Sequence, residues 1–210
     1  MKIIFATGNP DKMFEIREIL DDICPSENVI SMKEAGLDPE IIEDGNTFEE
    51  NAMIKATVVF DAAKKAGMKD ILVLADDSGL CVDALNGEPG IYSARYLGKD
   101  TSYRIKNANL IERVNNEGNG NRRAEFVCAI AAVFPDGSKK TVRGIVEGEI
   151  ADAEYGSNGF GFDPIFYVPS LGCTTAELEP AAKHAISHRG NALRLMKKEI
   201  EAYEKNTDNK

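Results

Sequence analysis

The chain has 210 residues, 43% hydrophobic and 29% charged, with a formal net charge of −10 at pH 7. This length fits one α/β domain, or two closely packed lobes, with a substantial buried core. The acidic balance, with no long basic run, argues against a surface for nucleic acid or an anionic membrane, because both need clustered Lys and Arg. It does not exclude one small anion, since a few local donors and a divalent metal outweigh the overall field.

Cysteine spacing and the amino-terminal residues indicate a cellular location. Cys24, Cys81, Cys128 and Cys173 include no C-x-x-C pair, so we do not expect a zinc site built from them. The residues before Thr7 are too few for a signal peptide. No apolar run approaches the roughly 20 residues that a membrane helix needs. We therefore expect a cytoplasmic protein.

The chain begins with a pattern typical of a strand, a turn and a helix. The apolar run at residues 2–6 ends at Thr7-Gly8-Asn9-Pro10. Apolar side chains then recur at helical spacing, at Ile16, Ile19, Leu20 and Ile23. We expect a second short strand near Val29–Met32, followed by an acidic loop through Gly45.

A second helix is predicted from its cap and its apolar stripe. Thr47 and Glu50 have capping-box spacing, in which a hydroxyl and a carboxylate satisfy free backbone amides. After the stop at Gly67, the continuous apolar run Ile71–Ala75 favours a strand covered on both faces. The stripe between these signals consists of Ala52, Ala56, Val59, Ala63 and Ala66.

The rest of the chain predicts a helix over 101–116, a hairpin and a final helix. The hairpin strands, 126–134 and 141–150, flank Pro-Asp-Gly-Ser, a strong turn signal. Ser187 is a good cap for the final helix, and we expect the polar tail from about residue 204 to fray. The inward positions of this helix are Leu193, Met196, Ile200 and Tyr203.

This order of elements predicts an α/β fold with two lobes: a mixed β-sheet flanked by helices, and a second, sheet-rich lobe formed by the hairpin. Residues 1–210 then form a single two-lobed domain, because no repeat, low-complexity block or clear linker divides the sequence. A central substrate cleft is the natural place for a ligand.

Two segments in the first half suit a phosphate group. The turn before Lys12 offers backbone amides and a helix amino terminus, and Glu15 lies on the same helix face as Lys12 and could orient it. The turn lacks the P-loop spacing, so an ordinary turn with a solvent-facing lysine is the alternative. Asn51 and Lys55 share one face of the second predicted helix, as an ordinary surface polar pair would.

The segment Ala75-Asp76-Asp77-Ser78-Gly79-Leu80 places two adjacent carboxylates at the predicted end of a strand, where open α/β sheets bind their ligands. Burying carboxylates without a cation or strong hydrogen bonds is costly, although turns also favour Asp, Ser and Gly. On the functional interpretation, one carboxylate holds Mg²⁺, which prefers oxygen ligands, and the other helps to position water.

Two segments in the second half suit the rest of a nucleotide. The first is Gly159-Phe160-Gly161-Phe162-Asp163-Pro164. Its glycines let the backbone approach a flat base, its aromatic rings can stack on that base, and Asp163 can accept a hydrogen bond from a ring N–H. The alternative is an aromatic turn packed in the core. Near Lys183, the charges of His188 and Arg189 fall in the first turn of the last helix and oppose its dipole. A bound anion explains these charges; exposed charges on a capped helix are the alternative.

In this order, the segments resemble the inosine/xanthosine triphosphate pyrophosphatase family over about Lys2 to Ala202. The resemblance rests on Thr7-Gly8-Asn9 with Lys12 and Glu15, Thr47–Ala52 with Lys55-Ala56, Ala75–Leu80, Pro89–Tyr96, Gly159–Phe166 and Ser187–Gly190. It implies a two-lobed, usually homodimeric α/β enzyme that uses Mg²⁺. Such an enzyme cuts non-standard purine nucleoside triphosphates (ITP, dITP, XTP) to the monophosphate and pyrophosphate.

The resemblance also implies roles for individual residues. Asp77 would bind the metal and act as general base for the attacking water, Lys55 would hold phosphate, and residues 160–163 would enclose the base. Substrate contacts are implied for Thr7, Gly8, Asn9, Pro10, Asp11, Lys12, Lys55, Ser78, Phe160, Gly161, Phe162, Asp163, Lys183, His188 and Arg189.

The second metal ligand departs from the family pattern. Several relatives place a Glu three residues before the glycine that precedes the Thr-Phe-x-Glu-Asn segment, and Ile42 occupies that position here. Either a register shift lets Glu43 reach the metal, or water completes the shell, which Mg²⁺ tolerates.

Three other functions remain to be tested against this one. A non-catalytic purine-nucleotide sensor would use the same pocket, but it has no need to gather carboxylates beside phosphates. A nucleic-acid module is disfavoured by the charge. A pyrophosphatase that prefers modified pyrimidines can be excluded only by comparing substrates.

Overall fold

The computed structural model describes residues 1–21 and 28–208, without the side chains of Asp11, Glu15, Thr207 and Asp208. Within this part of the chain, seven strands form one sheet in the order β2-β1-β3-β4-β5-β6-β7. Strand β1 (Lys2–Phe5) is parallel to β2 (Val29–Ser31) and to β3 (Ile71–Val82), whereas β5 with β6 and β6 with β7 are antiparallel. The predicted mixed sheet flanked by helices is confirmed.

The other strands are β4 (Arg123–Val133), β5 (Lys139–Ile150), β6 (Phe166–Val168) and β7 (Cys173–Thr174). The helices are α1 (Pro10–Leu20), α2 (Phe48–Lys65), α3 (Tyr103–Glu117), α4 (Pro180–Ile186) and α5 (His188–Asp208), with short 3-10 helices η2 (Asp83–Leu85), η3 (Gly90–Arg95), η4 (Asp163–Ile165) and η5 (Thr175–Glu177). The sequence pattern did not predict β6, β7 or α4, because each is too short to show a period. The expected helical position Ile23, and Cys24, lie outside the described residues.

The chain divides into two compact units. Unit 1 comprises Met1–Asp77, Cys128–Gly144 and Arg189–Lys210, and unit 2 comprises Ser78–Val127 and Ile145–His188. Strands β3, β4 and β5 each pass from one unit into the other. The hairpin therefore does not form a second lobe by itself, and that expectation is wrong. Its strands of 11 and 12 residues are long enough to contribute side chains to both cores.

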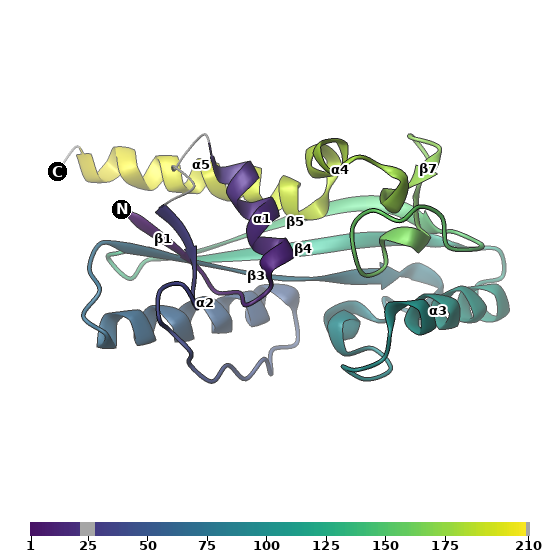
Figure 1. The fold of residues 1–210 in the computed structure, drawn as a ribbon, viewed down its shortest axis with the longest axis horizontal. Coiled ribbons are helices and arrows are strands. Elements are labelled where there is room, and N and C mark those ends of the chain that lie inside the picture. Colours follow the sequence, from purple (N-terminus) through teal and green to yellow (C-terminus); the bar gives the residue numbers. More distant parts are fainter. Residues whose placement is uncertain (22–27, 209–210) are drawn as a thin grey trace. The chain divides into compact units, whose positions relative to one another are not determined.

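In unit 1, helices cover both faces of the sheet. Helices α1 and α5 lie on one face and α2 on the other (Figure 1). The core on the α1 and α5 side includes Ile3, Phe5, Ile16, Leu72, Leu74, Ile130, Leu193 and Met196. On α2 the predicted stripe is buried from Ala52 to Ala63, but Ala66 is exposed because the helix ends at Lys65.

The amino-terminal cap of α2 matches half of the predicted capping box. The Thr47 hydroxyl accepts a hydrogen bond from the backbone N–H of Glu50 at 3.1 Å. The Glu50 carboxylate accepts from the N–H of Asn46 at 2.6 Å, one residue earlier than a capping box requires. Both bonds still satisfy amides near the start of the helix, which is the physical purpose of the motif.

Helix α5 is longer than the sequence indicated. Its predicted inward residues Leu193, Met196 and Ile200 are buried, and the Tyr203 ring stacks on Phe134 with centroids 4.5 Å apart. The helix continues to Asp208, and the expected fraying from about residue 204 stays a prediction. Within the described residues, no helix has the length and apolar character to cross a membrane.

Unit 2 has its own core. It is built from the second half of β3, the first half of β4, helix α3 and the segment around β6. Its buried residues include Leu80, Val82, Leu110, Val114, Phe126, Ile150, Phe162 and Phe166. The segment around β6 and η4 therefore packs in this core, directly after most of the predicted base-binding residues.

Candidate active site

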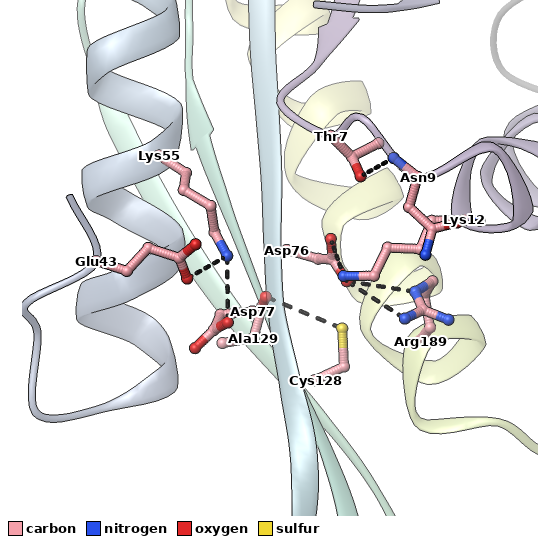
Figure 2. Close-up of polar contacts among 10 residues, drawn as sticks. All are labelled: Thr7, Asn9, Lys12, Glu43, Lys55, Asp76, Asp77, Cys128, Ala129 and Arg189. Atoms are coloured by element: carbon pink, nitrogen blue, oxygen red, sulfur yellow. Dashed lines mark hydrogen bonds and ion pairs between the residues drawn. The ribbon is translucent and has the colours of Figure 1, made fainter. Parts of the chain in front are cut away.

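The two adjacent aspartates lie on opposite faces of strand β3. The strand does not end at Ala75 but continues to Val82, and successive side chains of a strand point to opposite faces. Figure 2 shows Asp77 with Lys55 and Glu43 on one side of the strand, and Asp76 with Lys12 and Arg189 on the other. The expectation that both carboxylates stand together at a strand end is therefore wrong, because the alternation of β3 separates them.

On the α2 side, one ammonium group joins two carboxylates. Lys55 Nζ donates to Glu43 Oε2 at 2.9 Å and to Asp77 Oδ1 at 3.2 Å. The side chains of Lys55 and Asp77 are each only 12% exposed. Asn51, one turn earlier on α2, donates from Nδ2 to Asp77 Oδ2 at 3.3 Å. Asn51 and Lys55 thus share one helix face, as predicted, but they face the sheet rather than solvent.

Burial governs the protonation of Asp77. It raises the pKa of this carboxyl above its ordinary value, an effect that the nearby Lys55 ammonium and the Asn51 hydrogen bond reduce but do not cancel. Burial alone would lower the pKa of Lys55, but the charges of Asp77, Asp76 and Glu43 raise it instead. Lys55 therefore stays charged, while Asp77 is a carboxylate with increased proton affinity, as a general base requires.

On the opposite face, Asp76 is held by two cations. Lys12 Nζ lies 2.9 and 3.1 Å from its carboxylate oxygens, and both Nε and Nη2 of Arg189 lie 3.4 Å from Oδ2. Asp76 is 2% exposed. Burial alone would raise the pKa of Asp76, but Lys12, Arg189 and Lys55 together hold it well below its ordinary value. Asp76 therefore remains ionised and orients two cationic side chains from α1 and α5.

Short-range hydrogen bonds close the turn between β1 and α1, and its role in anion binding stays a prediction. The side chain of Asn9 accepts from the N–H of Lys12 at 3.3 Å, and the N–H of Asn9 donates to the Thr7 hydroxyl at 3.1 Å (Figure 2). Gly8 is exposed, and a Cβ there would meet open space. Pro10 is the first residue of α1, where its missing N–H is not needed. The Asp11 side chain lies outside the described part, so its predicted role stays a prediction.

In unit 2, Asp163 anchors the predicted base-binding loop, residues 159–163. Its Oδ2 accepts from the N–H of Phe160 at 2.8 Å and from Lys183 Nζ at 2.7 Å, and its Oδ1 accepts from the Thr175 hydroxyl at 2.8 Å. Asp163 and Lys183 are 3% and 7% exposed. The two residues predicted to contact substrate therefore form a buried ion pair that fixes the loop.

The two aromatic residues of this loop have different environments. Phe160 is 37% exposed, and Lys183 Nζ lies 5.0 Å from its ring centroid. Phe162 is 4% exposed and meets Tyr103 edge to face, with centroids 5.3 Å apart. The ring of Phe160 is accessible for stacking, whereas Phe162 packs in the core. Gly161 between them has φ +72°, a conformation that glycine adopts without strain.

Two further predicted substrate residues have unequal support. His188 is the first residue of α5, as predicted, and its ring stacks on Phe126 with centroids 4.8 Å apart and 16° between the planes. Ser78 lies half-buried in β3, immediately after Asp77. Their roles with substrate remain predictions.

The sequence missed Thr175, which holds the second oxygen of Asp163 and is 5% exposed. Thr175 follows Asp163 by 12 positions, in the separate short helix η5, so no spacing pattern connects the two. It also missed the role of Asn51, whose contact with Asp77 spans 26 positions.

The carboxylates on the α2 side fit a hard divalent cation. Within the described residues, no group of three or more His, Cys, Asp and Glu side chains is arranged to hold a metal. However, Glu43 and Asp77 both reach one ammonium group, and Mg²⁺ binds through one or two carboxylates together with water and substrate phosphates. Ile42 is 66% exposed and carries no carboxylate, and the role of Glu43 as second metal ligand stays a prediction.

Together, the fold and these clusters define an α/β protein suited to a phosphate-bearing ligand and a hard cation. The chain belongs to the Ham1 family, whose model matches residues 3–199. It is 49% identical over 201 residues to the dITP/XTP pyrophosphatase of an Exiguobacterium species, covering 95% of this chain and 97% of that protein. It is 45% identical over 196 residues to the dITP/XTP pyrophosphatase of Clostridium perfringens, covering 93% and 95%.

Solved structures share the fold. The Staphylococcus aureus Ham1 protein is 44% identical, with a TM-score of 0.82, and the match covers 97% of this chain and 100% of that one. A HAM1 protein from Coxiella burnetii is 40% identical, with a TM-score of 0.83, and the match covers 96% and 99%. Both matches therefore cover nearly the whole of this chain.

Proposed function

We propose that this protein hydrolyses non-standard purine nucleoside triphosphates (ITP, dITP and XTP) between the α- and β-phosphates, and so removes them from the nucleotide pool. The observation that carries the proposal is the buried Asp77, whose raised pKa and contact with Lys55 suit a base beside a metal and phosphates. The printed names of the relatives from Exiguobacterium and Clostridium perfringens, both dITP/XTP pyrophosphatases, support the same reaction.

In this reaction Asp77 accepts a proton from the water that cleaves the α–β phosphate linkage. We propose that Asp77 and Glu43 also hold Mg²⁺, which when bound would neutralise phosphate charge and lower the pKa of bound water. Lys55, which contacts both carboxylates, would hold a phosphate oxygen of the substrate. Each of these groups lies on α2, β3 or the loop before α2.

Lys12 and Arg189, on the other face of β3, would provide further contacts to the phosphate chain. Lys12 supplies an ammonium group and Arg189 a planar guanidinium that suits phosphate oxygens. Asp76 does not need to touch substrate in this scheme. Its ion pairs with Lys12 and Arg189 hold both cations in place before the anion arrives, which lowers the entropy lost on binding.

The loop at residues 159–163 would recognise the base. Phe160 offers an accessible ring for stacking, and Lys183 supplies N–H donors beside it. Hypoxanthine and xanthine carry a carbonyl at C6, where adenine carries an amino group. A donor directed at O6 is left unpaired when adenine binds, and buried mismatches of this kind are strongly discriminated.

The first experiment is a substrate panel. The purified protein is incubated with Mg²⁺ and ITP, XTP, dITP, GTP, ATP or dUTP, and products are identified by chromatography. Monophosphate and pyrophosphate from ITP or XTP, with little from ATP or GTP, supports the proposal. Release of single phosphates, or tight binding without turnover, contradicts it, and the latter would identify a nucleotide sensor. Omitting Mg²⁺ tests the metal requirement.

We further propose that the protein acts as a cytoplasmic homodimer. The dimer follows from the family resemblance and the location from the sequence composition. Light scattering coupled to size-exclusion chromatography would give a mass near 46 kDa, twice the 22.9 kDa of one chain. A single-chain mass across the working concentration range contradicts the dimer.

A further inference from the structure

The side-chain amide of Asn51 joins the loop that carries Glu43 to strand β3. Its Oδ1 accepts a hydrogen bond from the backbone N–H of Gly45 at 2.9 Å, and its Nδ2 donates to Asp77 Oδ2 at 3.3 Å. Asn51 is 1% exposed. One buried side chain therefore contacts both segments that carry the carboxylates proposed to bind metal.

The orientation of this amide is determined from both sides. A backbone N–H can only donate, so the atom that faces Gly45 must be the amide oxygen, and an ionised carboxylate can only accept, so the atom that faces Asp77 must be the nitrogen. A flipped amide would place two donors together at Gly45 and two acceptors together at Asp77. Asn51 thus fixes the position of the loop and the rotation of the Asp77 carboxylate at once.

The loop packs too closely on Asn51 for any residue but glycine at position 45. A Cβ at Gly45 would lie 2.8 Å from Asn51 Oδ1 and 2.7 Å from Glu50 Cβ, both closer than real Cβ contacts. The bridge is therefore a tightly packed buried contact, not a loose surface hydrogen bond.

Asn51 and Lys55 hold the same two segments in different ways. Lys55 contacts Glu43 and Asp77 directly, but its positive charge would be repelled by a cation bound to the same carboxylates. Asn51 is uncharged, and its bonds to Gly45 and Asp77 leave Asp77 Oδ1 and the Glu43 carboxylate available. The amide can therefore keep the two carboxylates in place while the ammonium group exchanges with a metal.

We propose that Asn51 is a positioning residue for the metal site: it holds Asp77 and the Glu43 loop at the separation at which both carboxylates bind one divalent cation. It acts through these residues and does not touch the metal. The inference rests on the proposed function for the assignment of the two metal ligands. Groups that orient metal ligands typically contribute 10- to 100-fold in metal affinity or activity.

The test measures metal binding without turnover. Mn²⁺, visible by electron paramagnetic resonance, is titrated into the nucleotide-free wild type and into Asn51→Ala, and the Mg²⁺ concentration that half-saturates ITP hydrolysis is measured for both. We expect Asn51→Ala to weaken both constants by at least about 10-fold. Thr57→Ala is the matched control, because Thr57 lies on α2 and its hydroxyl accepts only from Lys139 in the described structure; it should leave both constants unchanged.

Gly45→Ala disrupts the same contact between Gly45 and Asn51 from the loop side. It tests the inference if Asn51→Ala does not fold. It should reproduce the loss of metal affinity, and the double variant should be no worse than the worse single one, because both break one coupled contact. A folded Asn51→Ala or Gly45→Ala with wild-type metal constants overturns the inference, even where the wild type hydrolyses ITP. A wild type that hydrolyses no nucleotide contradicts the proposed function instead, and the Mn²⁺ titration then still decides the role of Asn51.

Discussion

The two faces of strand β3 use the same residue type in opposite ways. Asp76 and Asp77 are neighbours in sequence and both are largely buried, yet the pKa of Asp76 is lowered and the pKa of Asp77 is raised. The difference comes from their partners. Asp76 is enclosed by Lys12 and Arg189, whereas Asp77 shares the single ammonium of Lys55 with Glu43.

The comparison separates a carboxylate that supports structure from one that is kept reactive. A buried carboxylate with two cations is stabilised in its charged form, so it holds α1 and α5 against the sheet but is a poor base. A buried carboxylate with a shared cation retains affinity for a proton and for a metal. The alternation of one strand is enough to give two adjacent residues these different properties.

The largest expected effect is the loss of turnover on the α2 face. Asp77→Asn should lower kcat/KM for ITP by about 1,000-fold or more, because it removes both a base and a metal ligand. Because the folded-state pKa of Asp77 is raised, its charge costs stability at neutral pH, so the variant should melt at or above the wild-type temperature. Steady-state kinetics and circular dichroism check the two parts. Retained turnover would remove Asp77 from the mechanism.

On the other face, the main loss should be in stability. Asp76→Asn leaves Lys12 and Arg189 without their buried counter-ion, and breaking a buried pair typically costs about 3–5 kcal/mol. Urea denaturation measures this loss. Asp61→Asn, an exposed aspartate of α2, is the control and should change stability by less than about 0.5 kcal/mol. Equal free energies of unfolding for Asp76→Asn and Asp77→Asn would contradict the proposed difference between the two carboxylates.

A substitution away from β3 should weaken substrate binding without the loss of turnover expected for Asp77→Asn or the loss of stability expected for Asp76→Asn. Phe160→Ala removes the accessible ring of the base loop, and one base–aromatic stack is worth about 1–3 kcal/mol, so KM for ITP should rise at least about 5-fold with little change in melting temperature. Phe14→Ala, on the 60% exposed ring of α1, is the control. An unchanged KM would show that the base does not stack on Phe160.

The smallest effect is a difference in pH dependence, measured without metal. The stability contributed by Asp76 is complete above the ordinary value of 3.8 and is lost as pH falls through its lowered folded pKa. The penalty from Asp77 appears as pH rises above 3.8 and is complete above its raised folded pKa. The difference in free energy of unfolding between wild type and Asp76→Asn should therefore change with pH only below 3.8. The difference between wild type and Asp77→Asn should change only above 3.8. Each difference should change by at most about 1.4 kcal/mol per pH unit. Gaps that change over the same pH range would contradict the assignment.

The sequence predicts the elements with long periodic patterns better than it predicts their side-chain contacts. Helix α2 and the β4–β5 hairpin follow from apolar spacing and turn residues, which are local signals. The length of β3 does not, because Asp76-Asp77-Ser78-Gly79 has the composition of a turn, and only the partners from α1, α2 and α5 make a strand with two buried carboxylates stable.

In the candidate site too, the sequence predicts the residues better than their contacts. Asp77, Lys55 and Lys12 are found from family motifs, but the separation of Asp76 from Asp77 requires β3 to continue past Ala75, which the turn-like composition of this segment does not indicate. Thr175 and the bridge of Asn51 to Gly45 depend on loops that fold back onto the sheet or the helix. Tertiary contacts of this kind leave no periodic trace in a single sequence.

Unit 1 is completed by residues that follow all of unit 2 in the chain. Asp76 and Arg189 are separated by 113 positions, and the core of unit 1 includes Leu193, Met196 and Ile200 of α5. Unit 2 has all of its residues once His188 has been synthesised, before α5 can contribute to unit 1. Chains usually fold from the amino terminus during synthesis, but here the unit that contains Met1 finishes second. Until then, Asp76 has only part of its charge compensation, and the nascent chain exposes the apolar face that α5 will cover.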